Sequence, residues 1–122
     1  MAHILVVDDS PTETHIISTT LEKHGHRISV AVDGKDGVEK ATQIIPDLIL
    51  MDVVMPELNG FQATRQLTQQ PATAHIPVIM VTTKDQKTDK MWAERQGAKG
   101  YITKPFDEEE LIQEVNRLLL EH

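Results

Sequence analysis

The stretch LILMD at positions 48–52 shows how this chain is built. Four apolar residues in a row suit a short β-strand that is covered on both faces, and this strand ends at an acidic residue. Residues 3–7 repeat the pattern, because their apolar run stops at Asp8, and residues 78–81 form a third run that stops at Thr82. Buried strands that each end at a polar side chain predict a parallel sheet with a binding site along one edge.

Amphipathic helical patterns separate the strands. Ser10 is placed to cap the first helix, Pro11 suits its first turn, and Glu13 sits where a capping box needs it. Apolar residues that recur three or four positions apart predict the face of each helix that meets the sheet. These faces are Ile16, Ile17, Thr20 and Leu21; then Val38, Ala41, Ile44 and Ile45; then Phe61, Thr64 and Leu67; and, in the last helix after Asp107, Leu111, Ile112, Val115, Leu118 and Leu119. A further helix is predicted at residues 85–96.

Two more strands complete the pattern. Ile28, Val30 and Val32 alternate with other residues, which is typical of a strand at the edge of a sheet, and residues 101–103 form a short fifth strand before Lys104. Five strands alternating with five helices predict one α/β domain over residues 1–122, with helices on both faces of a parallel sheet. Right-handed crossovers leave few arrangements, and we expect the flavodoxin-like, doubly wound (βα)5 fold with strand order 2-1-3-4-5.

The composition excludes several classes of protein. The 122 residues carry a net charge of −7 and their lysines are scattered, so we expect no nucleic-acid binding. No apolar run is long enough to cross a bilayer, and the first residues lack the basic start of a signal peptide, so we expect no membrane insertion and no secretion. Without cysteine the chain has neither disulfides nor thiol chemistry, which suits a cytoplasmic location.

The polar residues that end the strands should meet in space. In a sheet with this order, strands one, three, four and five are neighbours, and their carboxyl ends lie along one edge. Two carboxylates about 4 Å apart repel by roughly 4 kcal/mol at an effective dielectric constant near 20, so a single lysine poorly compensates three of them. The residues at these ends are Asp8 and Asp9, Asp52, Thr82 and Thr83, and Lys104.

A divalent cation would balance this cluster. Its ligands would all be oxygen atoms, with no histidine or cysteine partner, which favours Mg²⁺ or Mn²⁺ over zinc. A carboxylate beside such an ion can attack an activated phosphoryl group and form an acyl phosphate. The added negative charge can be sensed by the Thr82 hydroxyl at the end of the next strand. We therefore expect Asp52 to accept a phosphoryl group beside a cation held by Asp8 and Asp9.

Four motifs resemble the receiver domains of bacterial two-component response regulators. They are ILVVDDSP at 4–11, DLILMDVVMPELNG at 47–60, PVIMVTT at 77–83 and GYITKPF at 100–106, and they span nearly the whole chain. The resemblance also implies a cis peptide bond before Pro105. It gives a role to each matching position: Asp52 as the phosphoacceptor, Asp8, Asp9 and the Val54 carbonyl as ligands of Mg²⁺, Thr82 as the switch hydroxyl, Lys104 as the phosphoryl-binding lysine, and Tyr101 as the aromatic residue that moves with the switch.

A narrower resemblance lies in residues 60–68 and 81–98, which look like the PilH-type receivers of type IV pilus chemosensory systems. It implies a stand-alone receiver without an effector domain, phosphorylated by a CheA-type histidine kinase and acting in twitching motility or chemotaxis. The implied partner surface for a downstream motility protein comprises the fourth helix, the fifth strand and the fifth helix. Trp92 in that fourth helix serves either packing or this surface. An alternative role is to drain phosphoryl groups from a shared kinase.

Other classes of function fit the sequence less well. A phosphohydrolase with an aspartyl nucleophile, of the haloacid-dehalogenase pattern, would carry a second aspartate two residues after Asp52, where Val54 stands. A flavin or nucleotide carrier would need a glycine-rich turn after the first strand, where Asp8 and Asp9 would repel a phosphate. Val54 has no group that positions water, and Lys84 is cationic. We therefore expect an acyl phosphate that does not hydrolyse fast, without turnover of external substrates.

Overall fold

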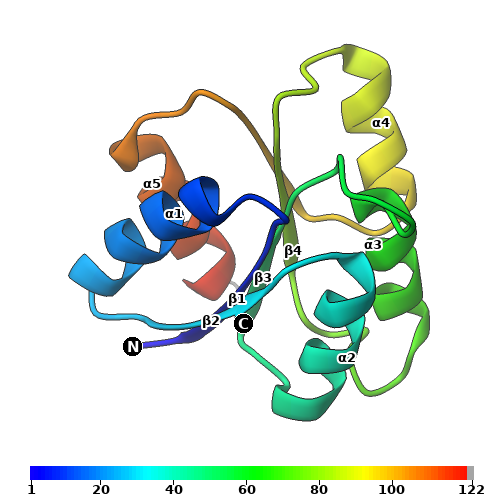
Figure 1. Cartoon of the computed structure of the whole chain (residues 1–122), viewed down its shortest axis with the longest axis horizontal. Helices are drawn as coiled ribbons and strands as arrows, with labels where there is room; N and C mark the ends of the chain where they lie inside the picture. Colours follow the sequence, from blue (N-terminus) through cyan, green and yellow to red (C-terminus); the bar gives the residue numbers. More distant parts are fainter. Residues whose placement is uncertain (121–122) are drawn as a thin grey trace.

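Five parallel strands form one sheet in the order β2-β1-β3-β4-β5, which confirms the predicted topology (Figure 1). The computed structural model describes residues 1–120. The strands are β1 (His3–Val7), β2 (Arg27–Ala31), β3 (Leu48–Met51), β4 (Val78–Thr82) and β5 (Gly100–Thr103). The helices are α1 (Pro11–Lys23), α2 (Gly34–Ile44), α3 (Gly60–Gln69), α4 (Lys87–Arg95) and α5 (Glu108–Leu120). Strand and helix alternate along the chain, as the doubly wound fold requires.

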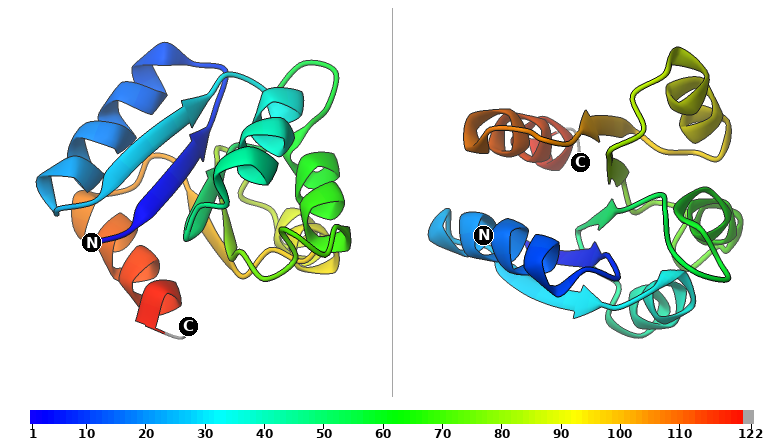
Figure 2. Two further views of the ribbon diagram at one scale, coloured as in Figure 1. Left: turned by 90° about the horizontal axis from the view of Figure 1, so that it is seen from below. Right: turned by 45° about the horizontal axis from the view of Figure 1, so that its top comes forward.

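The two faces of the sheet bury separate sets of side chains, because successive residues of a strand point in opposite directions. In β1, Ile4 and Val6 pack into the core beneath α1 and α5, whereas Leu5 and Val7 pack into the core beneath α2, α3 and α4. Both views of Figure 2 keep α1 and α5 together on one side of the sheet. The central strands are covered twice, which explains their unbroken apolar runs.

Four helices begin at a polar side chain that accepts a hydrogen bond from the N–H of the third helical residue. The bonds at Ser10 and Asp107 confirm the predicted starts of α1 and α5. The bonds run from Glu13 N–H to Ser10 (3.3 Å), from Asp36 N–H to Asp33 (2.8 Å), from Gln62 N–H to Asn59 (2.9 Å) and from Glu110 N–H to Asp107 (2.7 Å).

Three apolar residues that periodicity assigned to the core are exposed instead. Ile16 is 49% exposed because it borders a surface pocket next to α1, and Thr14 is buried in its place. Ile45 follows the last turn of α2 in a left-handed conformation (φ 44°), which carries its side chain off the face that meets the sheet. Val32 lies one residue beyond the edge strand β2 and loses the cover that the strand has.

The fourth helix is shorter than predicted. It begins at Lys87 rather than at residue 85, because the N–H of Gln86 donates to the Asp89 carboxylate at 3.1 Å and the chain turns into the helix there. Within residues 1–120, no helix combines the length and the apolar character needed to span a membrane.

Candidate functional site

The hydrogen-bond ladder of the sheet continues one residue beyond several strands and fixes the backbone of the site. Each of three site residues donates its N–H to the last carbonyl of a neighbouring strand, so its position is set before its side chain leaves the sheet. The bonds are Asp8 N–H to Ala31 (3.1 Å), Asp52 N–H to Val7 (2.9 Å) and Lys104 N–H to Thr82 (2.8 Å). The predicted convergence of the strand ends is therefore confirmed.

Three carboxylates meet at this edge of the sheet. Asp8, Asp9 and Asp52 each place one oxygen within 4.8 Å of the others. Asp8 is buried, Asp52 is partly buried and Asp9 is exposed, so the cluster opens to solvent on one side. All its ligand atoms are oxygens, which suits Mg²⁺ or Mn²⁺. Among the residues that the structure describes, no other group of three or more acidic or histidine side chains lies close enough to share an ion.

Lys104 brings the positive charge of the cluster. Its Nζ donates to Asp8 Oδ2 at 3.0 Å and lies 3.9 Å from Asp52 Oδ1. It also lies 3.9 Å from Glu13 Oε2 in the first turn of α1. Four carboxylates around one ammonium group give the site a formal charge of −3, one unit more negative than the three aspartates and Lys104 would give. The peptide bond between Lys104 and Pro105 is cis, as the motif implied.

The surroundings of Asp52 make its ionised form costly. Burial is the main cause and raises the pKa of this carboxyl to about 6, while the charges of Asp8 and Asp9 add to the rise. The Lys104 ammonium opposes it, as does the N–H of Val53, which donates to Asp52 Oδ1 at 2.8 Å. A divalent cation in the cluster would favour the ionised form, which is the nucleophilic one.

The hydroxyls of Thr82 and Tyr101 both reach the backbone of Lys84. Thr82 is fully buried at the end of β4, and its Oγ1 accepts a hydrogen bond from the Lys84 N–H at 3.3 Å. Tyr101 in β5 donates its hydroxyl to the Lys84 carbonyl at 2.7 Å. Burial, aided by the charges of Asp89 and Asp85, raises the pKa of Tyr101 to about 12, which keeps this hydroxyl a donor. A single residue of the loop between β4 and α4 thus connects the two side chains.

Helix α3 begins directly against the backbone of Asp52. The N–H of Gly60 donates to the Val53 carbonyl at 2.9 Å, and a Cβ at position 60 would collide with the Asp52 carbonyl oxygen. Glycine is required by this close approach. Val54 lies in the intervening loop, two residues after Asp52, with an exposed side chain.

The amino-acid sequence matches a known protein family. The model of the response regulator receiver domain matches residues 4–116. The chain belongs to the response regulator receiver domain family. The motif resemblance is thereby confirmed, and with it the assignment to two-component phosphorelay signalling.

Related proteins match over nearly the whole receiver. Protein PilH of Pseudomonas aeruginosa is 60% identical over 119 residues, which cover 98% of each chain. The DNA-binding dual master transcriptional regulator RpaA of Synechocystis is 41% identical over 119 residues, but the receiver spans only 49% of that protein. The chemotaxis protein CheY4 of Vibrio cholerae has a TM-score of 0.91 at 33% identity, covering 97% of this chain and 98% of that one.

One structural relative bears on the metal. The receiver domain of a Pseudomonas aeruginosa sensor histidine kinase has a TM-score of 0.90 at 31% identity, with 97% of each chain covered. Its structure contains a magnesium ion coordinated in the active site cleft. The carboxylate cluster of the present receiver has the chemistry to hold such an ion.

The sequence pattern did not predict one charged residue of the site, Glu13. It assigned Glu13 to a reciprocal capping box with Ser10. In the structure the Ser10 N–H donates instead to Asp8 Oδ1 at 2.9 Å, so only the Ser10 side chain's half of the box forms. The side chain of Glu13 is free of that role and lies beside Lys104. The available signal was the aspartate two residues before Ser10, because such a side chain commonly accepts from this N–H.

Proposed function

We propose that Asp52 accepts a phosphoryl group and holds it as an acyl phosphate. Asp8 and Asp9 act with Asp52 and the Val54 carbonyl as the protein ligands of Mg²⁺, which Mn²⁺ can replace. Lys104 binds the transferred phosphoryl group. The observation that carries this proposal is the meeting of three carboxylate oxygens within 4.8 Å, beside an ammonium group, at the carboxyl edge of a parallel sheet.

Transfer of the phosphoryl group to Asp52 depends mainly on alignment of the reacting atoms and on compensation of negative charge. A carboxylate oxygen of Asp52 attacks the phosphorus atom, and the bond from phosphorus to the leaving group breaks. Mg²⁺, when bound, supplies positive charge to the carboxylates and to the transferred oxygens. Lys104 Nζ already lies 3.9 Å from Asp52 Oδ1. After transfer, the Lys104 ammonium binds a phosphoryl oxygen in place of a carboxylate oxygen. Slow hydrolysis then restores Asp52, so the receiver is a regulator without turnover of an external substrate.

Thr82 and Tyr101 are the switch residues in this proposal. The new phosphoryl oxygens offer the Thr82 O–H a charged acceptor, and a turn of the Thr82 side chain toward them disturbs the bond that its Oγ1 now accepts from the Lys84 N–H. A shift of Lys84 changes the carbonyl that Tyr101 now holds at 2.7 Å. The readout surface is α4, β5 and α5, where Met91 and Trp92 are each 47% exposed. Trp92 emission should therefore change on phosphorylation, and an unchanged spectrum would count against this route.

The relatives support a proposal for the pathway. At 60% identity over nearly the full length of PilH, we assign this receiver to a type IV pilus chemosensory system that controls twitching motility. A CheA-type histidine kinase in the cytoplasm supplies the phosphoryl group, and a motility protein reads the switched surface. Transfer of the phosphoryl group from purified kinase to the receiver, faster than from an unrelated histidine kinase, is the expected result.

Intact mass measurement tests the assignment of Asp52. Wild-type receiver incubated with a small phosphodonor and Mg²⁺ should gain the mass of one phosphoryl group, and Asp52→Asn should gain none. Asp47→Asn is the matched control, because Asp47 precedes β3 at the opposite end of the same strand. An unmodified wild type, or an adduct that persists in Asp52→Asn, would refute the proposal. Turnover of phosphomonoesters would favour the phosphohydrolase instead.

A further inference from the structure

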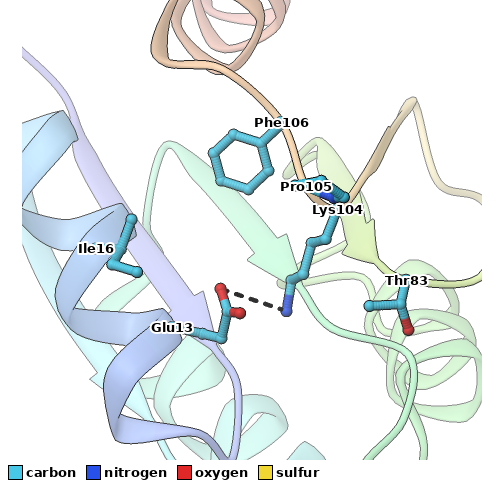
Figure 3. A pocket seen from close by; sticks show the side chains of 6 residues that line it. All are labelled: Glu13, Ile16, Thr83, Lys104, Pro105 and Phe106. Atoms are coloured by element: carbon cyan, nitrogen blue, oxygen red, sulfur yellow. Dashed lines mark ion pairs between the residues drawn. The ribbon is translucent and has the colours of Figure 1, made fainter.

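A surface pocket of about 380 Å³ adjoins the acidic cluster and shares Lys104 with it. Figure 3 shows its lining residues, with the Glu13 carboxylate and the Lys104 ammonium facing each other across it. The walls come from the first two turns of α1, from the residue that follows β4 and from the loop between β5 and α5. Three of the residues are apolar, namely Ile16, Pro105 and Phe106. Its volume is within the range of pockets that hold small ligands.

Among the described residues that line this pocket, Glu13 is the one with an acidic side chain. It is aimed there because the reciprocal half of its capping box is blocked, as the Ser10 N–H is bonded to Asp8. The carboxylate lies 3.9 Å from Lys104 Nζ, which is beyond a hydrogen bond, so it retains acceptor capacity for a visiting group. Glu13 thus adds a fourth carboxylate beside Lys104, next to the three aspartates of the cluster.

We propose that Glu13 is a positioning residue that favours phosphodonors with an imidazole leaving group over donors with an anionic leaving group. This inference rests on the proposed function of Asp52. In phosphoryl transfer the attacking and leaving atoms lie roughly in line, so the leaving group is on the side of the phosphorus away from Asp52. The apolar walls of the pocket suit a flat imidazole ring, and the Glu13 carboxylate accepts a hydrogen bond from its protonated nitrogen.

The transfer step balances without any other reactant. In a phosphoimidazole whose second ring nitrogen is protonated, the Asp52 oxygen forms the new bond to phosphorus and the bond from phosphorus to nitrogen breaks. The electron pair of that bond returns to the ring nitrogen, the proton stays on the other nitrogen, and neutral imidazole leaves. Glu13 stabilises the protonated ring that makes this departure easy. Acetyl phosphate releases acetate, whose developing negative charge Glu13 repels.

The test compares two donors on the same protein. Initial rates of adduct formation are measured by intact mass with phosphoimidazole and with acetyl phosphate, at saturating Mg²⁺, for wild type, Glu13→Gln, Glu13→Lys and Glu22→Gln. Glutamine keeps an acceptor oxygen at position 13, so this variant removes charge rather than shape. Glu22→Gln is the matched control, because Glu22 is an exposed residue near the other end of α1. A ratio of two rates cancels any effect of the substitution on stability or on the fraction of folded protein.

The expected change is a shift in donor preference. A unit charge about 6 Å from a leaving group alters a rate by about threefold in water. Loss of the Glu13 charge should slow transfer from phosphoimidazole and speed transfer from acetyl phosphate. In Glu13→Gln the ratio of the phosphoimidazole rate to the acetyl phosphate rate should therefore fall by about tenfold. Glu13→Lys should lower it further, and Glu22→Gln should leave it unchanged. An unchanged ratio in both position-13 variants, or an equal shift in Glu22→Gln, overturns the inference. Failure of wild type to accept from either donor would overturn the proposed function of Asp52 instead.

Discussion

Strand β3 and the residue that follows it occupy opposite environments. The side chains of Leu48–Met51 are 0–1% exposed and pack into the two apolar cores, one on each face of the sheet. Asp52 comes next in the chain and lies among like charges at an opening to solvent. In β1, Val7 is likewise followed by a carboxylate of the cluster, although Asp8 itself stays buried. The apolar strands hold the sheet together, and their ends hold carboxylates that would separate in a flexible chain.

This contrast separates the strands, which stabilise the fold, from the residues at their ends, which carry the chemistry. Apolar burial stabilises the strands by about 25 cal/mol for each Å² removed from water, and this gain is independent of pH and salt to a first approximation. Repulsion among the carboxylates opposes folding and depends on pH and on cations. Substitutions within the strands should therefore change stability without changing the site, and substitutions at the ends should couple the two.

The largest expected effect is that of Leu50→Ala in the middle of β3. The lost transfer free energy and the cavity should lower the free energy of unfolding by about 2–5 kcal/mol in urea titrations. The affinity of the folded fraction for Mg²⁺ should stay that of wild type. Leu120→Ala is the control, because Leu120 is 85% exposed and its truncation should cost less than about 0.5 kcal/mol. A weaker Mg²⁺ affinity in Leu50→Ala would show that strand and site are not separable.

Gly60→Ala should lower both the stability of the fold and the affinity of the site for Mg²⁺. Its Cβ would collide with the Asp52 carbonyl oxygen, so the start of α3 or the Asp52 backbone must move, at about 1–3 kcal/mol of stability. We expect weaker Mg²⁺ binding as well, measured by calorimetry. Gly25→Ala provides the comparison, since position 25 has φ +90° but open space around it. That variant should lose stability through backbone strain while its Mg²⁺ affinity is unchanged.

Removing Mg²⁺ should reveal a pH dependence of smaller size. The folded-state pKa of Asp52 is raised from 3.8 to about 6, so between these values the native state binds more protons than the unfolded state. Without Mg²⁺, the free energy of unfolding should therefore fall as the pH rises from about 4 to about 6, and it should level off at higher pH. The total fall should be about 2 kcal/mol after allowance for the partial exposure of Asp52. Asp52→Asn should abolish this segment of the pH profile, which urea titrations at a series of pH values would reveal. A profile with the same slope in Asp52→Asn would assign the effect to other groups.

The smallest effect is expected for Tyr101→Phe. It removes the hydrogen bond from the tyrosine hydroxyl to the Lys84 carbonyl at 2.7 Å, which should cost about 0.5–1.5 kcal/mol of stability. Uptake of the phosphoryl group should keep its wild-type rate, because Tyr101 does not touch Asp52 in the proposed chemistry. The change in Trp92 emission on phosphorylation should shrink if the bond through Lys84 transmits the switch. An undiminished change would remove Tyr101 from that route.

Local patterns predicted most of the fold because four of the five strands, all but β2, end their apolar runs at a polar residue. Leu48–Met51 could be assigned to a doubly covered strand, and the edge position of β2 followed from its mixed pattern. Periodicity failed at Ile16 and Ile45. Both satisfy the spacing of a core face, but a neighbouring surface pocket and a left-handed helix end put them in solvent.

The amino-acid sequence by itself determined the sheet order and the meeting of Asp8, Asp52 and Lys104, because carboxyl ends of neighbouring parallel strands share one edge. Tertiary structure alone decided what else reaches that edge. Asp8 takes the Ser10 N–H that a reciprocal capping box would give to Glu13, and Glu13 instead lies beside Lys104. The physical reason is that a hydrogen bond depends on distance and on rival partners in space, and spacing along the chain encodes neither.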